Sequence, residues 1–325
     1  MEENTDSSFP NTGLGLSGLE PDDGAEPVLH GVHSVRSASQ STLDPSETRK
    51  FQRLANKWWD EQGEFAALHS MNDLRVPFIR DNLLNVTGGR QWGRPLSGTR
   101  ILDVGCGGGL LTEPLGRLGA DVLGIDPVED SVRTAELHRS FDPVLRERVQ
   151  YRACPLEELS EEEAEAFDAV VASEVVEHVA DLDTFACCCC QVLKPGGSLF
   201  ITTINKTRLS YALGIVVAER LLGIVPDGTH DWEKFISPVE LERLLESSGL
   251  VVQSVRGMLF NPATGSWSWT QSTAINYALH AVKQGEEPQP ERARSPAETE
   301  DHAVSSDARD EHLVKLKKWQ LPCFT

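Results

Sequence analysis

Short apolar runs alternate with helix-like segments through the middle of the chain. The runs typical of buried strands are TRILDVGC, ADVLGID, RVQYRAC, FDAVVASE, GSLFITTI, LVVQSVRGMLF and INYALHAV. Most of them are separated by amphipathic segments, for example GLLTEPLGRLG, EDSVRTAELHRSF and DTFACCCCQVL. Short continuous apolar strands that alternate with helices form parallel sheets covered on both faces. The pattern therefore predicts an α/β fold with a Rossmann-like, doubly wound, mostly parallel sheet of seven strands.

Three further segments add to this alternation. FQRLANKWWDEQGEFAALH, before the first strand, predicts an N-terminal helix, and NKTRLSYALGIVVAERLLGIVPDGTH is an apolar insertion after the fifth strand. SPVELERLLESSG is the helix with the clearest ends. Ser237 and Glu240 can form a capping box at its start, and Gly249 can end it.

Composition divides the 325 residues into three parts. Residues 1–47 are rich in Gly, Ser, Pro and acidic residues, which predicts a disordered N-terminal segment. Residues 48–284 contain the alternating pattern and form the predicted domain, and 285–325 are predicted to be a disordered or atypical C-terminal tail. The Ser-rich stretch 29–43 contains no acid and is compatible with a remnant of a mitochondrial transit peptide, although the first residues are not those of a normal one.

Charge and cysteine usage exclude some classes of protein. The formal net charge is −20, which argues against a nucleic-acid partner because phosphate binding needs many Lys and Arg residues. The seven Cys residues, four of them consecutive at 187–190, lack the spacing of a zinc site or a disulfide framework. They indicate a reducing compartment. No run reaches the roughly 20 apolar residues that a membrane span needs.

The sharpest motif is the loop DVGCGGGL at 103–110, between the first strand and the next helix. Gly105 and Gly107 let the backbone approach a ligand closely. A dinucleotide fingerprint places its third glycine at position 110, which is Leu110 here, so a dehydrogenase is the weaker interpretation. Asp103 suits a cationic ligand better than a pyrophosphate. S-adenosylmethionine fits, since it has a sulfonium and an ammonium group and no phosphate.

Two acidic residues at strand ends are candidate cofactor contacts. Asp126 ends the second strand, where a carboxylate can accept hydrogen bonds from both ribose hydroxyls. The alternative for Asp126 is a helix N-cap. The alternative for Asp103 is a structural acid that bonds loop amides.

The segment after the fourth strand contains two carboxylates and an imidazole. If it is helical, Glu174, Glu177 and His178 occupy positions i, i+3 and i+4 and share one face. Such a set could hold Mg²⁺ or Mn²⁺, which would lower the pKa of a catechol hydroxyl. The alternative is a metal-free site, in which the Glu177–His178 pair closes the substrate pocket and His178 is the general base.

The motifs resemble a known family. DVGCGGG, GID and LKPGG resemble the class I S-adenosylmethionine-dependent methyltransferases, and further segments over 48–284 resemble the mitochondrial ubiquinone-biosynthesis O-methyltransferases. Those segments are WWD, EF and LH near the N-terminus, GTHDWEKFISPVEL, FNPATGSW and NYALHAV. The resemblance implies the class I methyltransferase fold and S-adenosylmethionine as the methyl donor. It also implies a divalent metal such as Mg²⁺ on Glu174, Glu177 and His178.

The resemblance implies roles for further residues. Arg75 would pair with the carboxylate of the donor, although by itself it could be a surface arginine. Asp103, Gly105, Gly107 and Asp126 would form the rest of the donor site. The side of the site that faces the fourth strand would be lined by Ser173.

The resemblance also implies substrates, location and partners. The substrates would be polyprenyl dihydroxybenzoate and demethylubiquinol, and the location the matrix side of the mitochondrial inner membrane, within a multi-enzyme complex. The apolar insertion, at 206–224, is too short to span a bilayer and would contact the membrane peripherally. Its alternative is a lid or core helix. For the whole chain, the alternatives are another small-molecule class I methyltransferase or a non-catalytic scaffold of the complex.

Overall fold

The computed structural model describes residues 42–87, 93–207, 210 and 234–285. The chain divides into two units, 1–284 and 285–325. Nearly all described residues belong to the first unit, and the fold below is that of this unit. Within these ranges no helix is long and apolar enough to cross a membrane.

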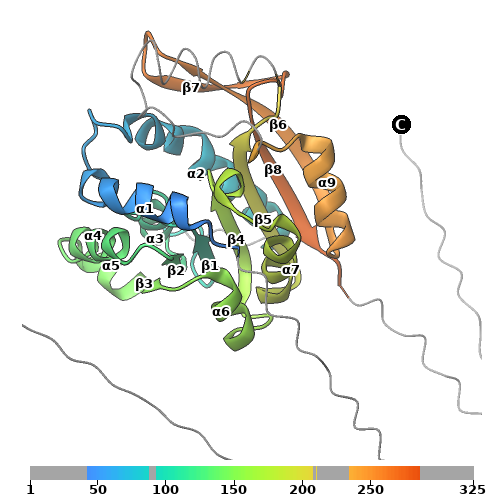
Figure 1. Cartoon of the computed structure of the whole chain (residues 1–325). Helices are drawn as coiled ribbons and strands as arrows, with labels where there is room; N and C mark the ends of the chain where they lie inside the picture. Colours follow the sequence, from blue (N-terminus) through green and yellow to red (C-terminus); the bar gives the residue numbers. More distant parts are fainter. Residues whose placement is uncertain (1–41, 88–92, 208–209, 211–233, 286–325) are drawn as a thin grey trace, which may run out of the picture. The chain divides into compact units, whose positions relative to one another are not determined.

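The centre of the fold is an eight-stranded sheet in the order β3-β2-β1-β4-β5-β8-β6-β7 (Figure 1). The strands β3, β2, β1, β4 and β5 are parallel, and β8 is antiparallel to both β5 and β6. The bounds are β1 Arg100–Val104, β2 Asp121–Asp126, β3 Val149–Ala153, β4 Phe167–Ser173, β5 Leu193–Ile204, β6 Leu250–Asn261, β7 Ser266–Thr270 and β8 Asn276–Lys283. The strand order reverses between β1 and β4. In open α/β sheets, ligands bind outside the carboxyl ends of the strands at such a point.

The mixed α/β fold with a mostly parallel sheet is confirmed, but the expected number of seven strands is one too few. The additional strand is β7, which pairs with β6 in a hairpin, from Gly257 with Thr270 to Asn261 with Ser266. Its sequence, SWSWT, alternates small polar and aromatic residues over only five positions. It has no buried residue and lies at the edge of the sheet, so it lacks the continuous apolar run that marks the buried strands.

Helices cover both faces of the sheet. Neighbouring strand residues point to opposite faces, so Leu102 packs in a cluster with α6, α7 and α9, whereas Ile101 packs with α2, α3 and α5. The helices are α1 Pro45–Leu54, α2 Ala66–Thr87, α3 Thr112–Arg117, α4 Glu129–Arg139, α5 Pro143–Arg148, α6 Leu156–Glu162, α7 Leu182–Val192 and α9 Pro238–Ser247, with short 3₁₀ helices η1 Ala55–Lys57 and η2 Val176–His178. The predicted capping box of α9 is present between Ser237 and Glu240, and Gly249 follows the helix at φ 87°.

The expected single N-terminal helix over 51–69 is wrong. The chain forms α1, then η1, and turns before α2 begins at Ala66. The buried Trp58 ring stacks on Phe65 with a centroid separation of 3.9 Å. A straight helix would separate these two residues along its axis, so packing the two rings together requires the turn.

The disordered segment expected over 1–47 is also too long. Leu43 forms an antiparallel bridge with Val179, and the Ala180 amide donates to the Thr42 carbonyl at 2.9 Å. Asp44 caps α1 by accepting from the Ser46 amide. Residues 42–47 are therefore part of the fold. The remainder of that segment, most of the insertion 206–224 and the tail from 286 on lie outside the described residues.

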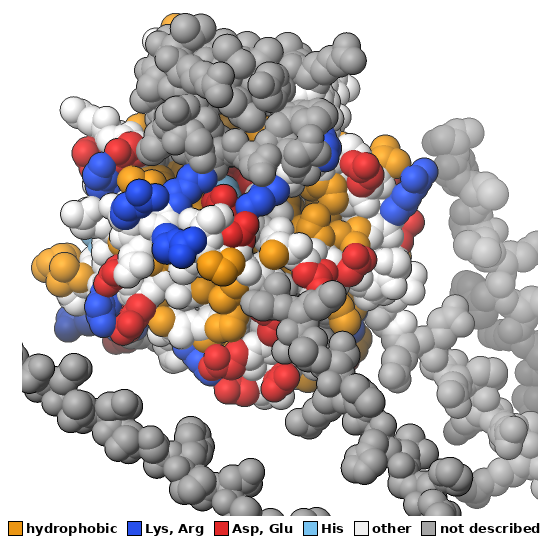
Figure 2. Space-filling model, in the orientation of Figure 1, with side chains coloured by type: hydrophobic (Ala, Val, Ile, Leu, Met, Phe, Trp, Pro, Cys, Tyr) orange, Lys and Arg blue, Asp and Glu red, His pale blue; other side chains and the backbone are white. Residues whose placement is uncertain are grey.

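Two surface features complete the description. On the face shown in Figure 2, side chains of both charges are interspersed. Some ion pairs of the described residues link positions far apart in the sequence, such as Arg100 with Glu163. Isolated pairs of this kind add little stability. The run of four cysteines lies on α7, where Cys187 is exposed while Cys188 and Cys189 are buried, and all are free thiols. As expected for a helix, the four side chains point in different directions.

Candidate active site

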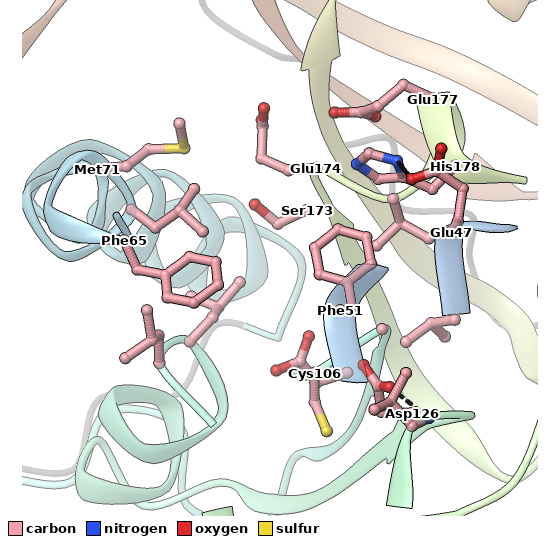
Figure 3. Close-up of a pocket in the computed structure, with 18 of the residues that line it drawn as sticks. Glu47, Phe51, Phe65, Met71, Cys106, Asp126, Ser173, Glu174, Glu177 and His178 are labelled. Atoms are coloured by element: carbon pink, nitrogen blue, oxygen red, sulfur yellow. Dashed lines mark hydrogen bonds and ion pairs between the residues drawn. The ribbon is translucent and has the colours of Figure 1, made fainter. Parts of the chain in front are cut away.

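A cavity of about 410 Å³ lies at the carboxyl ends of β1, β2 and β4. Figure 3 shows its lining, with Phe65 and Met71 on one side, Phe51 on another, and carboxylates at two heights. All sequence-predicted site residues except Gly107 line this cavity; they are Arg75, Asp103, Gly105, Asp126, Ser173, Glu174, Glu177 and His178. The structure thus brings together residues that lie up to 103 positions apart, from 75 to 178.

The glycine loop turns away from β1 with positive φ angles at Gly105, Gly107 and Gly109. Gly105 lines the cavity, and a Cβ there would lie 2.7 Å from Val175 Cγ2. Gly107 does not line it, because a Cβ on this residue would lie 2.5 Å from the Trp58 ring. The expected contact between Gly107 and a ligand stays a prediction. The Gly107 amide donates to Asp126 Oδ2 at 2.9 Å.

Asp126 and Asp103 are both buried at the floor of the cavity. Asp126 Oδ1 accepts from the Val128 amide at 2.8 Å, so this side chain holds both the glycine loop and the start of α4. Asp103 Oδ2 accepts from the Thr112 hydroxyl at 2.6 Å. Burial raises the pKa of each carboxyl to about 6. Near neutral pH the floor is therefore negative.

Arg75 is a buried cation beside these acids, so the alternative of a surface arginine is wrong. It lies on α2, and only 3% of it is exposed. Its Nη1 donates to Ser173 Oγ at 2.7 Å, and its Nε donates to Asn72 Oδ1 at 2.7 Å. Burial lowers the pKa of Arg75 to about 10, although the negative charges of Asp103 and Glu174 act to raise it. The guanidinium therefore stays charged at neutral pH.

The segment after β4 is not the α-helix that the predicted metal face requires. The Glu174 amide donates to the Thr202 carbonyl of β5 at 2.8 Å, which extends the sheet pairing by one residue. Glu174 then turns the chain with a left-handed φ of 58°, and only Val176–His178 form a 3₁₀ helix. The three predicted ligands therefore do not share a helix face, although all three line the cavity (Figure 3).

Glu177 is the most deeply buried acid of this segment. Its Oε2 accepts from the Thr203 hydroxyl at 2.7 Å, while its Oε1 has no hydrogen-bond partner among the described residues. Burial, and after it the negative charge of Glu174, raise the pKa of Glu177 well above its ordinary value. An unpaired oxygen beside a second acid makes this corner of the cavity suitable for a positive charge.

His178 contacts α1, which the sequence did not indicate. Its Nδ1 lies 2.9 Å from Glu47 Oε2, and the Phe51 ring meets the imidazole edge-on with centroids 5.0 Å apart. Burial tends to raise the pKa of Glu47, but the hydrogen bond and charge of His178, with Lys50, hold it at about 2. A local signal existed, since Asp44 followed by Pro45 is typical of a helix start.

Known proteins resemble the chain over most of its length. Residues 102–201 match the model of a methyltransferase domain family. The chain is 62% identical over 284 residues to a mitochondrial ubiquinone biosynthesis O-methyltransferase of Homo sapiens, covering 87% of this chain and 77% of that protein. It is 46% identical over 243 residues to a ubiquinone biosynthesis O-methyltransferase of Methylobacterium sp. (strain 4-46), covering 74% of this chain and 96% of that protein.

Proposed function

The chain belongs to the ubiquinone biosynthesis O-methyltransferases, which depend on S-adenosylmethionine, and from this premise we propose that it methylates the phenolic oxygen of a polyprenyl-tailed catechol. One observation supports this most strongly: the buried Arg75 and the two buried acids Asp103 and Asp126 line one cavity. The donor has a carboxylate, an ammonium group and a sulfonium, which match these charges.

Each charged group has a proposed partner on the donor. Arg75 pairs with the donor carboxylate, Asp103 with its ammonium group, and Asp126 with the ribose hydroxyls. Ser173 holds the Arg75 guanidinium in place through the 2.7 Å hydrogen bond. Gly105 provides close approach of the backbone, and Gly107 acts through Asp126.

The chemistry follows from charge. The sulfonium methyl is already electrophilic, so the reaction needs a deprotonated phenolic oxygen in line with it at near-attack distance. His178 accepts the phenolic proton, with Glu177 beside it; the new O–C bond forms as the S–C bond breaks, and the sulfur leaves as a neutral thioether. Both charges disappear in this step. Apolar walls such as Phe51 and Phe65 exclude water and therefore favour it.

We also propose that Glu174, Glu177 and His178 hold a divalent metal such as Mg²⁺, and in that form of the site His178 is a ligand rather than the general base. The donor chemistry fits, since Glu177 Oε1 is buried without a partner in the described structure and Glu174 adds a second carboxyl group to the lining. A bound dication would lower the pKa of a catechol hydroxyl and orient it. Within the described ranges, however, no three His, Cys, Asp or Glu side chains are grouped closely enough to hold a metal ion. Metal binding therefore requires these side chains to move together.

The proposed substrates are polyprenyl dihydroxybenzoate and demethylubiquinol. An apolar wall supports a tailed substrate: Leu259, Phe260 and Trp267 of the β6–β7 hairpin line the cavity. Trp267 Nε1 donates to the Ala67 carbonyl at 2.8 Å, which fastens the hairpin to α2. We expect the first units of the tail to lie along this wall.

The names of the relatives also guide our proposals for the location and partners of this chain. The mammalian relatives are mitochondrial by name, and a mitochondrial location is assigned to this chain on that ground. We propose the matrix side of the inner membrane, peripheral contact through 206–224, and association with other ubiquinone-biosynthesis proteins. The methyltransferase domain would then comprise the proposed 48–284 together with the ordered residues 42–47, and 285–325 would be a disordered or atypical tail outside it.

Calorimetry tests the cofactor class directly. S-adenosylmethionine titrated into the purified chain should release or absorb heat with one-to-one stoichiometry, whereas NAD should give none. Heat with NAD and none with the methyl donor would overturn the proposal. Binding of the donor without methyl transfer to any catechol would instead favour a non-catalytic scaffold.

A further inference from the structure

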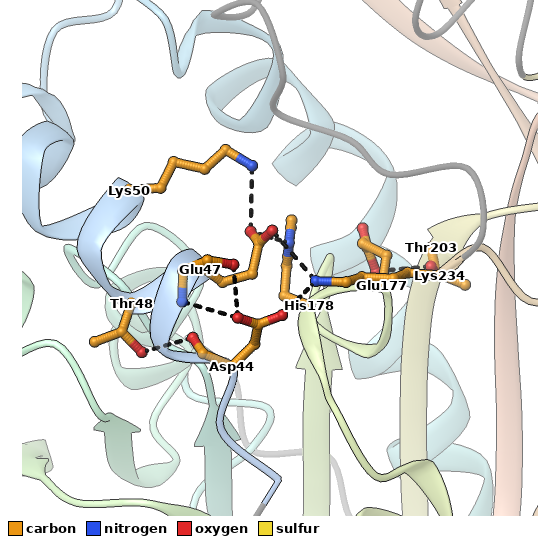
Figure 4. A network of polar contacts seen from close by, with 9 residues as sticks. Asp44, Glu47, Thr48, Lys50, Glu177, His178, Thr203 and Lys234 are labelled. Atoms are coloured by element: carbon orange, nitrogen blue, oxygen red, sulfur yellow. Dashed lines mark hydrogen bonds and ion pairs between the residues drawn. The ribbon is translucent and has the colours of Figure 1, made fainter.

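α1 provides a carboxylate to the imidazole of His178 from 131 residues earlier in the chain. The distance between Glu47 Oε2 and His178 Nδ1 is 2.9 Å, and both side chains are mostly buried, with exposed fractions of 12% and 15%. Figure 4 shows the pair within a network of polar contacts that also includes Asp44 and Lys234. Glu47 and His178 both line the cavity, so the contact lies at the proposed reaction centre.

The contact decides which nitrogen of His178 faces the reaction. A carboxylate can only accept a hydrogen bond, so Nδ1 has a proton, and in the neutral ring this is the only ring N–H. Nε2 is then unprotonated and has a lone pair, which a general base and a metal ligand both need. Phe51, which meets the ring edge-on, restricts its rotation from the same helix.

Glu47 is itself held by two lysines. Lys50 Nζ lies 3.2 Å from Glu47 Oε2, and Lys234 Nζ lies 3.5 Å from Glu47 Oε1. Lys234 also donates to Asp44 Oδ2 at 2.6 Å, and Asp44 is the residue that caps α1. The carboxylate is thus fixed from its own helix and from the segment that precedes α9.

None of the residues of α1 is fully buried, but Phe51 and Leu54 pack against the cluster of Trp58, Phe65 and Leu110. Polar contacts add to this packing. Apart from the network around Lys234, it is joined to the domain by the Leu43–Val179 bridge just before it and by the hydrogen bond from Gln52 to Asp130. Leu43 pairs with the residue that directly follows His178. Docking of α1 and orientation of the imidazole are therefore expected to occur together.

We propose that Glu47 is a positioning residue for His178: it holds Nδ1–H so that Nε2 faces the substrate, and it does so only when α1 is docked. The inference rests on the proposed function, because it assumes that His178 acts at the reaction centre as base or ligand. It extends that function by making the N-terminal helix part of the catalytic geometry, beyond its role as a wall of the cavity.

A merely structural role for Glu47 makes a different prediction. Asp44 with Lys234 and the Leu43–Val179 bridge already attach α1, so a structural Glu47 would add a little stability and leave turnover unchanged. A positioning Glu47 affects kcat and the tautomer of the ring, with little effect on donor binding.

The kinetic test compares Glu47→Gln, Glu47→Asp and the control Glu163→Gln. Glu163 pairs with Arg100 at the opposite ends of the strands, so its variant removes an ion pair far from the cavity. Glu47→Gln should lower kcat about 10- to 100-fold, the usual effect of losing such a carboxylate partner. The KM for S-adenosylmethionine should stay within about twofold. Glu47→Asp should recover part of the loss, and Glu163→Gln should match the wild type.

The spectroscopic test does not depend on any variant of Glu47 folding. ¹⁵N spectra of histidine-labelled protein, with the His178 signal identified by its absence in His178→Gln, report which ring nitrogen has the proton. The wild type should show the Nδ1–H tautomer, and Glu47→Gln should shift it towards a mixture. An Nε2–H tautomer in the wild type, or wild-type kcat in a folded Glu47→Gln, would overturn the proposal. A wild-type chain that transfers no methyl group to any catechol would overturn the proposed function, whereas the tautomer would still report the Glu47 contact.

Discussion

Arg75 donates from Nη1 to Ser173 Oγ at 2.7 Å, which joins α2 to the end of β4 beneath the cavity. Ser173 also shares a 2.6 Å hydrogen bond with Thr202 of β5. Arg75, a cation that lines the cavity, is thus fixed by two strands of the sheet, in the position where we propose that the donor carboxylate binds.

Replacing Arg75 by Met should weaken binding of S-adenosylmethionine by about 1.5–3 kcal/mol, the usual value of a hydrogen bond to a charged group. Arg75→Lys should not restore it fully, because an ammonium cannot bind a carboxylate in a bidentate manner. Calorimetry measures both. The control is Arg80→Met on the same helix, which removes only an exposed pair with Asp81. Unchanged affinity in Arg75→Met would remove Arg75 from the donor site.

Cofactor affinity should decrease as pH falls through about 6. Burial raises the pKa of Asp103 and Asp126 to about 6, and a protonated carboxyl no longer attracts an ammonium group or accepts two hydroxyl hydrogen bonds. Protonation of each carboxyl should weaken donor binding by up to about tenfold per pH unit below 6. Calorimetry at pH 5 and pH 7.5 measures this, and Asp126→Asn should flatten the profile. A flat wild-type profile would contradict the assignment of both acids.

The same shifts predict the opposite effect on the stability of the ligand-free protein. In both acids the folded-state pKa is above the ordinary value of 3.8, so the folded state binds protons more tightly than the unfolded state. Their contribution to the free energy of unfolding should therefore increase as pH falls from about 6 towards 4 and decrease as pH rises. Urea unfolding of the wild type and Asp126→Asn over this range measures the contribution of Asp126 as the difference.

Gly107→Ala should destabilise the domain by more than Gly196→Ala. Both glycines have positive φ angles, 53° and 77°, so both variants incur backbone strain of about 1–2 kcal/mol. A Cβ at Gly196 meets nothing within 4 Å, whereas one at Gly107 would lie 2.5 Å from the Trp58 ring. The difference in Tm between the variants therefore measures the clash with Trp58. Equal Tm values would mean that Trp58 moves aside at no cost.

Trp267→Ala should raise the KM for a long-tailed catechol about tenfold and leave a short-tailed catechol unaffected. The indole lines the cavity, and losing one large aromatic contact typically costs about 1–3 kcal/mol of binding free energy. A loss of about 1.4 kcal/mol corresponds to a tenfold weaker affinity. The short-tailed substrate is the internal control for folding. An equal effect on both substrates would contradict the proposal that the tail lies along the hairpin.

A chelator should lower methyl transfer, and added Mg²⁺ should restore it. Glu177→Gln should prevent this restoration while donor binding is retained, since Glu177 lies in the corner that we propose for the metal and not beside Arg75. Full activity in the chelator would exclude the metal and leave His178 as general base. The alternative considered from the sequence would then be correct.

The sequence predicts the position of the site well because strand ends are local features. The glycine loop, Asp126 and the segment from Ser173 follow consecutive apolar runs, and the carboxyl ends of parallel strands meet at one edge of the sheet. Once the runs are recognised, their neighbours in the cavity follow. The clear ends of α9 are predicted for the same reason, because capping depends on adjacent residues.

Features that depend on distant contacts could not be predicted. The left-handed turn at Glu174 is set by the hydrogen bond with Thr202 on β5, so the expected helix face does not form. Glu47 acquires its role only when α1 docks beside a residue 131 positions later. β7 forms because β6 offers it an edge, not because its own five residues form an apolar run.

The central claim is that the cavity at the strand ends binds a positively charged methyl donor next to a catechol. The most direct measurement is transfer of a radiolabelled methyl group from S-adenosylmethionine to a polyprenyl catechol by the purified chain, with Asp126→Asn and His178→Gln alongside. We predict a labelled methyl ether from the wild type, product from Asp126→Asn only at raised donor concentration, and little product from His178→Gln at any concentration. Equal product from all three proteins would contradict the account.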